Sequence, residues 1–147
     1  MKKLLPPNYF LMLLCLSIVV HFLFPISKII HSPYNWFGVL PIFFGVVINL
    51  WTDNLFKKEK TTVKPGEKPS SLVVSGPFRV SRHPMYLGMT AILLGVSTLL
   101  GSISSFVFPF VFVLLMEKLF VPLEEENMKK IFGKKYLDYK KKARRWL

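Results

Sequence analysis

Four long stretches of apolar, almost uncharged residues alternate with polar connections along the chain. They cover residues 8–24, 36–55, 85–100 and 105–121. Each is close in length to the roughly 17–25 residues that carry a helix across a bilayer. Because lipid offers no hydrogen bonds to the backbone, such stretches cross a membrane as helices. The pattern therefore predicts an all-α, polytopic membrane protein with four transmembrane helices.

The last segment, residues 123–147, has a different pattern. Its apolar residues recur at steps of three and four with lysines between them, at Met128, Phe132, Tyr136, Tyr139, Ala143 and Trp146. That spacing predicts a cytoplasmic amphipathic helix on the inner membrane surface, broken at Gly133, with its lysines attracted to anionic lipid. The polar loop at residues 56–82 contains the turn signal Lys64-Pro65-Gly66, and either a flexible linker or a lid fits its composition.

Charge fixes the expected orientation of these segments. The chain carries 20 lysines and arginines against 8 acidic residues, a net charge of +12. With four spans, 19 of the 20 basic residues lie on one side, and only Lys28 lies on the other. The positive-inside rule makes that side cytoplasmic, so both termini and the loop at residues 56–82 should face the cytoplasm from the inner membrane. Basic flanks of membrane helices explain the charge, and no nucleic-acid partner is expected.

Composition narrows the class further. At 147 residues, 52% of them hydrophobic, the chain is expected to form one membrane domain. Cys15 is its single cysteine, which excludes an intrachain disulfide and a cysteine-rich metal site, and no metal is expected. The start, Lys2-Lys3 before an apolar stretch, imitates a signal peptide, but no small-x-small cleavage site follows. The first stretch is therefore expected as a retained helix.

Two pairs of glycines lie seven residues apart, Gly38 with Gly45 and Gly88 with Gly95. Small residues on one helix face allow two backbones to approach closely, so helix packing is the first interpretation of both pairs. Close approach of a ligand to Gly88 is the alternative.

The stretch Arg82-His83-Pro84-Met85-Tyr86-Leu87-Gly88 joins the basic loop to the third apolar stretch. Proline is favoured at the first helical position, so a helix is expected to begin there. A cation, an imidazole and a phenol then lie at one membrane depth. They suit a binding site, and they also suit interfacial anchoring by a snorkelling arginine and a belt tyrosine.

An acidic triplet, Glu124-Glu125-Glu126, follows the fourth apolar stretch. Negative charge near a helix N-terminus is stabilising, which is a sufficient structural reason for it. These carboxylates also face the same interface as Arg82 and His83, so a shared site is the second interpretation.

Four elements in order resemble the isoprenylcysteine carboxyl methyltransferase and phospholipid methyltransferase families of integral membrane enzymes. They are LVVSGPF at residues 72–78, SRHPMYLG at 81–88, the pair Glu124-Glu125, and FGKKYLDY at 132–139. The resemblance covers about residues 72–147, half of the chain, and the first two helices show none. It rests on the order and spacing of the four elements together.

The resemblance implies methyl transfer from S-adenosylmethionine, in a pocket formed by the last two helices and the C-terminal segment. It places Arg82 beside the acceptor group as the catalytic residue. It places five residues around the cofactor: His83, Tyr86, Gly88, Glu124 and Glu125. Glu125 matches the cofactor-side carboxylate, and Glu124 is its neighbour.

The chemistry of methyl transfer agrees with these residue types. Displacement at a sulfonium needs alignment and desolvation more than acid–base help. A carboxylate such as Glu125 can accept hydrogen bonds from the ribose or the methionine amine, and Tyr86 can face the cation. Arg82 suits a bidentate grip on an anionic acceptor. For His83 a binding role is favoured over that of a general base.

The predicted function is methyl transfer to a lipidic or membrane-partitioned acceptor, with a prenylcysteine-like carboxylate as the leading class. Phospholipid amines and small hydrophobic thiols or acids remain alternatives. Two other classes are a noncatalytic membrane interaction protein and a small transporter. Coupled transporters place ionisable residues mid-membrane, but only His21 and Asn49 lie near such a position, and neither is central. The oligomeric state is left open.

Overall fold

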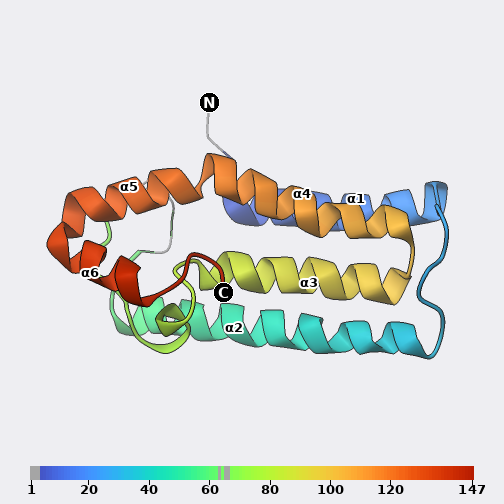
Figure 1. The fold of residues 1–147 in the computed structure, drawn as a ribbon, viewed down its shortest axis with the longest axis horizontal. Helices are drawn as coiled ribbons and strands as arrows, with labels where there is room; N and C mark the ends of the chain where they lie inside the picture. Colours follow the sequence, from blue (N-terminus) through green and yellow to red (C-terminus); the bar gives the residue numbers. More distant parts are fainter. Residues whose placement is uncertain (1–3, 63, 65–66) are drawn as a thin grey trace.

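The computed structural model describes residues 4–62, 64 and 67–147, which form helices and connecting loops (Figure 1). Lys2, Lys3 and the turn signal at Pro65-Gly66 lie outside the described residues. The helices are α1 Pro6–Leu23, η1 Tyr34–Gly38, α2 Val39–Lys58, η2 Gly76–Arg79, α3 Pro84–Leu100, α4 Ile103–Leu119, α5 Val121–Phe132 and α6 Lys134–Lys142. Two isolated bridges are the only β pairing among the described residues, so the all-helical prediction is confirmed.

Three helical segments are long and apolar enough to cross a membrane. They are α1, the combined η1 and α2 at Tyr34–Lys58, and the combined α4 and α5 at Ile103–Phe132. The third apolar stretch forms α3, a helix of 17 residues. At 1.5 Å per residue it is about 26 Å long. The structure thus has three candidate spans and a shorter apolar helix among them.

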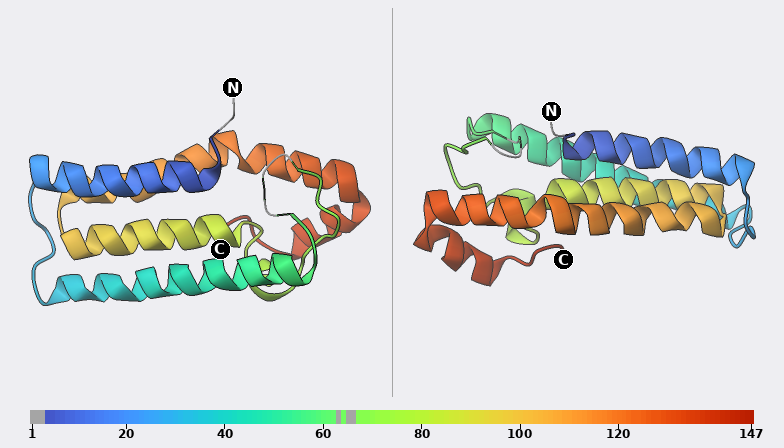
Figure 2. Two further views of the ribbon diagram at one scale, coloured as in Figure 1. Left: turned by 180° about the vertical axis from the view of Figure 1, so that it is seen from behind. Right: turned by 90° about the horizontal axis from the view of Figure 1, so that it is seen from above.

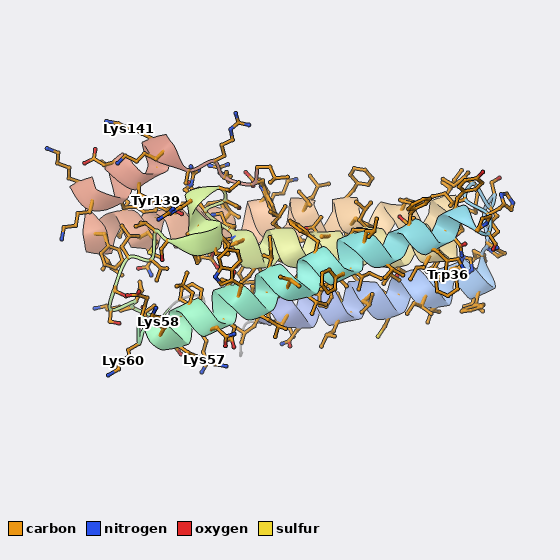
Figure 3. The ribbon with its side chains drawn as sticks, turned by 90° about the horizontal axis from the view of Figure 1, so that it is seen from below. Trp36, Lys57, Lys58, Lys60, Tyr139 and Lys141 are labelled. Carbon is orange, nitrogen blue, oxygen red and sulfur yellow. The ribbon has the colours of Figure 1, made fainter. Side chains whose placement is uncertain are left out.

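Helix α3 is the centre of the bundle. It packs against α2 on one side and against α1 and α4 on the other, whereas α1 packs mainly on α4. Its buried residues are Pro84, Tyr86, Gly88, Met89, Leu93, Gly95 and Ser97. The other helices turn many apolar side chains outward, as expected for surfaces that face lipid (Figure 3). Every group at the start of α3 is therefore held by neighbours on several sides.

Glycines set the distance between α2 and α3. A Cβ added to Gly45 would lie 2.3 Å from the carbonyl oxygen of Gly88, and one added to Gly38 would lie 2.3 Å from that of Gly95. Both distances are shorter than any contact a side chain tolerates. The packing role predicted for the two glycine pairs is confirmed.

The two ends of the bundle differ in charge. Lys57, Lys58, Lys60 and Lys141 lie at one end, and Trp36 lies at the other (Figure 3). At the Trp36 end, α3 finishes at a left-handed Gly101, whose carbonyl accepts the N–H groups of the loop that follows α1. The basic end contains the start of α3 and the whole C-terminal segment.

The C-terminal segment consists of two helices. Helix α5 continues α4, and α6 turns back beside it (Figures 1 and 2). The turn is at Gly133, as predicted, with a φ of +51° that favours glycine. The buried face of α6, Tyr136 and Tyr139, packs on Val73 and Phe78 before α3. The predicted spacing of aromatic residues thus reflects packing on protein here, and contact of the segment with the membrane surface stays a prediction.

Candidate active site at the start of α3

A pocket lies at the basic end of the bundle. Its walls come from the end of α2, the loop before α3, the first turn of α3, and the inner faces of α5 and α6. Its polar lining comprises Arg82, His83, Tyr86, Glu124, Glu125 and Tyr136 among others. Five of the six residues predicted for the site are thus brought together.

The local sequence places His83 at the N-terminus of α3. Pro84 takes the first helical position, where its missing N–H costs nothing, and His83 precedes it as the N-cap residue. The backbone N–H of His83 donates to the hydroxyl of Ser81 at 3.2 Å. One turn further on, the ring of Tyr86 lies parallel to the imidazole, with ring centroids 5.6 Å apart. The start of the helix therefore presents two stacked aromatic rings to the pocket.

Glu124 connects these two rings. Its carboxylate accepts a hydrogen bond from the hydroxyl of Tyr86, and its second oxygen lies 3.2 Å from Nδ1 of His83. Among the described residues no lysine or arginine pairs with it. Glu124 is thus an acidic group of the pocket whose partners are a phenol and an imidazole.

The second nitrogen of His83 has no hydrogen-bond partner among the described residues. Nε2 is buried and lies 3.6 Å from Glu125 Oε1, which is beyond hydrogen-bonding distance. Burial of the imidazole disfavours its charged form, but the carboxylates of Glu124 and Glu125 outweigh burial and raise the pKa of His83 above its usual value. A protonated His83 therefore offers one free N–H at the pocket.

Glu125 is surrounded by cations. Arg82 donates to its Oε1 from Nε at 3.1 Å and from a terminal nitrogen at 2.8 Å, and Lys140 donates to Oε2 at 3.0 Å. Arg145 reaches both oxygens, at 3.2 and 3.3 Å. The side chain of Glu125 is only 8% exposed. A carboxylate buried to this degree needs such partners, and here it has three.

Arg82 uses its remaining donors on the C-terminal segment. A terminal nitrogen donates to the carbonyl of Ala143 at 2.7 Å and to that of Lys140 at 3.3 Å. With its other nitrogens on Glu125 and 8% of its side chain exposed, the guanidinium has no free edge for an acceptor. The structure therefore places Arg82 in the site, but as a group that ties the start of α3 to α5 and α6.

Gly88, the sixth predicted residue, lies outside the pocket. It faces α2, where an added Cβ would lie 2.3 Å from Oδ1 of Asn49 and 2.9 Å from the carbonyl of Gly45. Its geometry fits the packing interpretation, and it is not among the residues that line the pocket.

Several residues around the pocket were not predicted from the sequence. Lys140 was expected among the lysines attracted to anionic lipid, and Arg145 was assigned no role, yet both contact Glu125. Tyr136 was assigned to a membrane-facing side, but it is 4% exposed and lines the pocket. Burial, with a contribution from Glu125, raises the pKa of Tyr136 to about 12, so its phenol stays neutral. No spacing along the chain relates these residues to Arg82, and only the return of α6 beside α5 brings them together.

Comparison with known proteins identifies the class. The profile of the phospholipid methyltransferase family matches residues 33–135, more than half of the chain. A protein of Haemophilus influenzae (strain ATCC 51907 / DSM 11121 / KW20 / Rd), described as an uncharacterized protein, is 35% identical over 63 residues, which are 43% of this chain and 100% of that protein. No solved structure matches the chain significantly.

The chain belongs to the phospholipid methyltransferase family, and it is thereby a membrane methyltransferase by class. The resemblance found in the sequence is confirmed. Its extent is corrected: the match begins at residue 33 and so includes α2, for which the sequence motifs showed no resemblance. Helix α2 packs along the whole of α3 and supplies Phe56 to the pocket, which gives this region a structural reason to be part of the family domain.

Proposed function

We propose that this protein transfers a methyl group from S-adenosylmethionine to a lipidic acceptor in the pocket at the start of α3. One observation carries the proposal. At the basic end of a membrane bundle, the carboxylate of Glu124 lines the pocket, and its partners among the described residues are Tyr86 and His83. A partly buried carboxylate that no described lysine or arginine neutralises favours a ligand that brings its own positive charge.

The residues present fit the cofactor. S-adenosylmethionine supplies, when bound, a methyl group on a positively charged sulfur. Glu124 would attract its cationic groups, and the ring of Tyr86 offers a face that a cation prefers. The free Nε2–H of a protonated His83 would donate to an oxygen of the cofactor. The cationic groups of the cofactor and at least one of its oxygens would therefore have complements on this wall.

Several of the remaining lining residues are apolar. They are Phe56, Val73, Met85 and Met128. In-line transfer from a sulfonium depends on alignment and on a dry site, since no proton moves in the transfer step itself. We assign this alignment to the apolar wall and the stacked pair of rings.

Among acceptors, we place a phospholipid amine first and a prenylcysteine-like carboxylate second. A carboxylate would need a free cation, and the guanidinium that was expected to supply it is bound to Glu125 and to two carbonyls. An amine needs no free cation: its ammonium form would first lose a proton, which the carboxylate of Glu124 could accept, and the nitrogen would then bond to the methyl group as the bond from the methyl group to sulfur breaks. Small hydrophobic thiols and acids are the third class.

We also propose that α3 crosses the bilayer as a fourth span, within a single domain, with both termini cytoplasmic. Its apolar length is about 26 Å at 1.5 Å per residue, and its basic end coincides with those of α2 and α4. The site then lies at the inner surface, where a lipid headgroup and a soluble cofactor can meet.

Binding and turnover test the proposal separately. Titration of the detergent-purified protein with S-adenosylhomocysteine should show binding that Glu124→Gln weakens roughly tenfold or more, as expected for a lost charge-assisted contact. Glu126→Gln is the matched control, because Glu126 pairs only with the exposed Lys130. Absence of binding in the wild type would make the chain a noncatalytic member of the family.

Turnover is then measured with labelled S-adenosylmethionine in vesicles. Phosphatidylethanolamine and an N-acetyl prenylcysteine are offered in parallel. Methylation of the amine supports the first acceptor class, and methylation of the prenylcysteine alone overturns our order.

A further inference from the structure

The residues after α6 are hydrogen-bonded to the loop segment just before α3. The N–H of Arg82 donates to the carbonyl of Arg144 at 2.9 Å, and the N–H of Arg144 donates to the carbonyl of Val80 at 3.2 Å. The hydroxyl of Ser81 donates to the carbonyl of Arg145 at 3.3 Å. Figure 1 shows the chain returning to the start of α3 after α6. The side chain of Arg145 is thereby delivered to the site from the far end of the sequence.

Arg145 lies between two carboxylates on different helices. Its guanidinium donates to both oxygens of Glu125 on α5 and to Glu117 on α4. The other oxygen of Glu117 accepts the indole N–H of Trp146 at 2.9 Å. Glu117 and Glu125 stand on either side of Phe120, where α4 ends and α5 begins. The guanidinium thus bridges the junction of the two helices.

The bridge also affects how close Glu125 lies to Nε2 of His83. Glu125 Oε1 stops 3.6 Å from Nε2, just short of a hydrogen bond, although the two groups attract each other. The groups that face His83 are Glu124 and Glu125 from α5 and Tyr86 from α3, with Arg82, Lys140 and Arg145 behind Glu125. Arg82, Lys140 and Arg145 together hold the carboxylate of Glu125 in this place. Arg145 differs from the other two because it also pairs with a second carboxylate, that of Glu117.

We propose that Arg145 is a positioning residue: anchored on Glu117, it holds Glu125 out of hydrogen-bonding reach of His83 and so leaves Nε2 of His83 free for the ligand. As a statement about catalysis this rests on the proposed function, whereas the geometry it asserts is independent of any activity. Arginine suits the task because its planar fork contacts two carboxylates at once, which a lysine cannot do.

Arg144 is the matched control. It is adjacent, carries the same charge, and is exposed, and its side chain has no ion pair with a described residue. Arg144→Gln removes the same charge from the same segment and leaves the backbone hydrogen bonds in place. Any effect specific to Arg145 therefore belongs to its bridge and not to the basic surface.

The decisive measurement is the pKa of His83, which NMR of labelled histidine can determine in the full-length protein. In Arg145→Gln, Glu125 is released toward His83, so the pKa of His83 should rise above its wild-type value. A general loosening of the site would instead expose the imidazole and lower its pKa toward the ordinary value. A fall, or no change, in Arg145→Gln overturns the proposal, and so does an equal rise in Arg144→Gln.

The affinity for S-adenosylhomocysteine provides the second readout. Arg145→Gln should weaken binding roughly tenfold, the effect of losing one charge-assisted hydrogen bond, and Arg144→Gln should stay within about twofold. Adding Glu117→Gln to Arg145→Gln should cost nothing further, because both act through one bridge. Additive losses overturn the bridge.

Two arrangements keep the test decisive. If Arg145→Gln does not fold, Arg145→Lys should show the same signs with smaller size, since it retains a charge and loses the fork. If the wild type neither binds the nucleoside nor transfers methyl groups, the proposed function fails, while the shift of the His83 pKa still decides the bridge.

Discussion

The rings of His83 and Tyr86 are stacked with an interplanar angle of 1°, and both side chains reach the same carboxylate, that of Glu124. One turn of α3 therefore presents its two polar tips to a single acidic group on another helix. This arrangement couples the protonation of the imidazole of His83 to the hydrogen bond of the phenol of Tyr86.

Tyr86→Phe removes the phenol donor and keeps the stacked ring. Glu124 then has His83 as its main partner, so we expect the unfolding free energy to fall by about 1 kcal/mol, the usual net value of a hydrogen bond. The pKa of His83 should rise, because the carboxylate is no longer shared. Chemical denaturation and histidine NMR check the two effects, and an unchanged pKa would contradict the coupling.

Stability should depend on pH through His83. Its pKa is raised in the folded protein by Glu124 and Glu125, against the effect of burial, so the folded state binds the proton more tightly than the unfolded state. The stabilisation is complete below the unfolded pKa of about 6.5 and is lost as pH rises through the higher folded pKa. The Tm of the wild type should fall across this window, and that of His83→Gln should fall less.

Substitution of Glu125 should mainly lower stability, whereas substitution of Glu124 should mainly lower ligand affinity. Glu125→Gln leaves Arg82 buried without its carboxylate, and we expect a loss of about 3 kcal/mol in unfolding free energy, as for a broken buried ion pair. Glu124→Gln should cost far less stability and should act mainly on the affinity for S-adenosylhomocysteine. Equal stability losses in the two variants would contradict this division.

Gly95→Ala should disrupt the α2–α3 contact and leave the chemistry alone. The new Cβ would lie 2.4 Å from the carbonyl of Gly38, so the helices must separate at a cost of roughly 1–3 kcal/mol. Thermal unfolding in detergent measures the loss. Gly88→Ala should behave in the same way, with nucleoside affinity retained in the folded fraction, and a selective loss of affinity would return Gly88 to the cofactor site.

Sidedness can be measured with introduced cysteines. The two cysteines are introduced in a Cys15→Ser background, as Lys60→Cys and Lys28→Cys, and both positions are exposed. Lys60 lies at the basic end of the bundle (Figure 3), whereas Lys28 pairs with Ser102 at the start of α4, at the opposite end. In intact cells an impermeant maleimide should label only Lys28→Cys. Labelling of both positions, or of Lys60→Cys alone, would contradict the orientation predicted from basic residues.

The sequence was sufficient to predict the helices and the spacing of His83 and Tyr86 at the start of α3. Apolar length predicted the helical segments, and one short motif placed His83 and Tyr86 a turn apart, because both lie in continuous local structure. Arg82 shows where such prediction ends. It lines the pocket beside the other candidate residues, but its partners come from α5, from α6 and from the residue after α6, and only tertiary packing selects them.

The same reason explains Arg145. An arginine near two others and several lysines has no local feature that distinguishes it, and its exposed neighbour Arg144 is chemically identical. Which of the two meets Glu125 depends on the register in which residues 143–146 lie along Val80–Arg82. A shift by one residue would exchange them.

This closing contact has a consequence for biosynthesis. Arg82 precedes α3, but the groups that bind its guanidinium lie further along the chain. They are the carboxylate of Glu125 on α5, the carbonyl of Lys140 on α6 and the carbonyl of Ala143 after it, and all three are translated after the apolar helices. Insertion of those helices must therefore proceed while the guanidinium is still hydrated at the membrane surface. The pocket can assemble only once α5 and α6, which supply Glu124, Glu125 and Tyr136, have emerged from the ribosome, so a chain stalled after α4 would have its apolar helices and no ligand site.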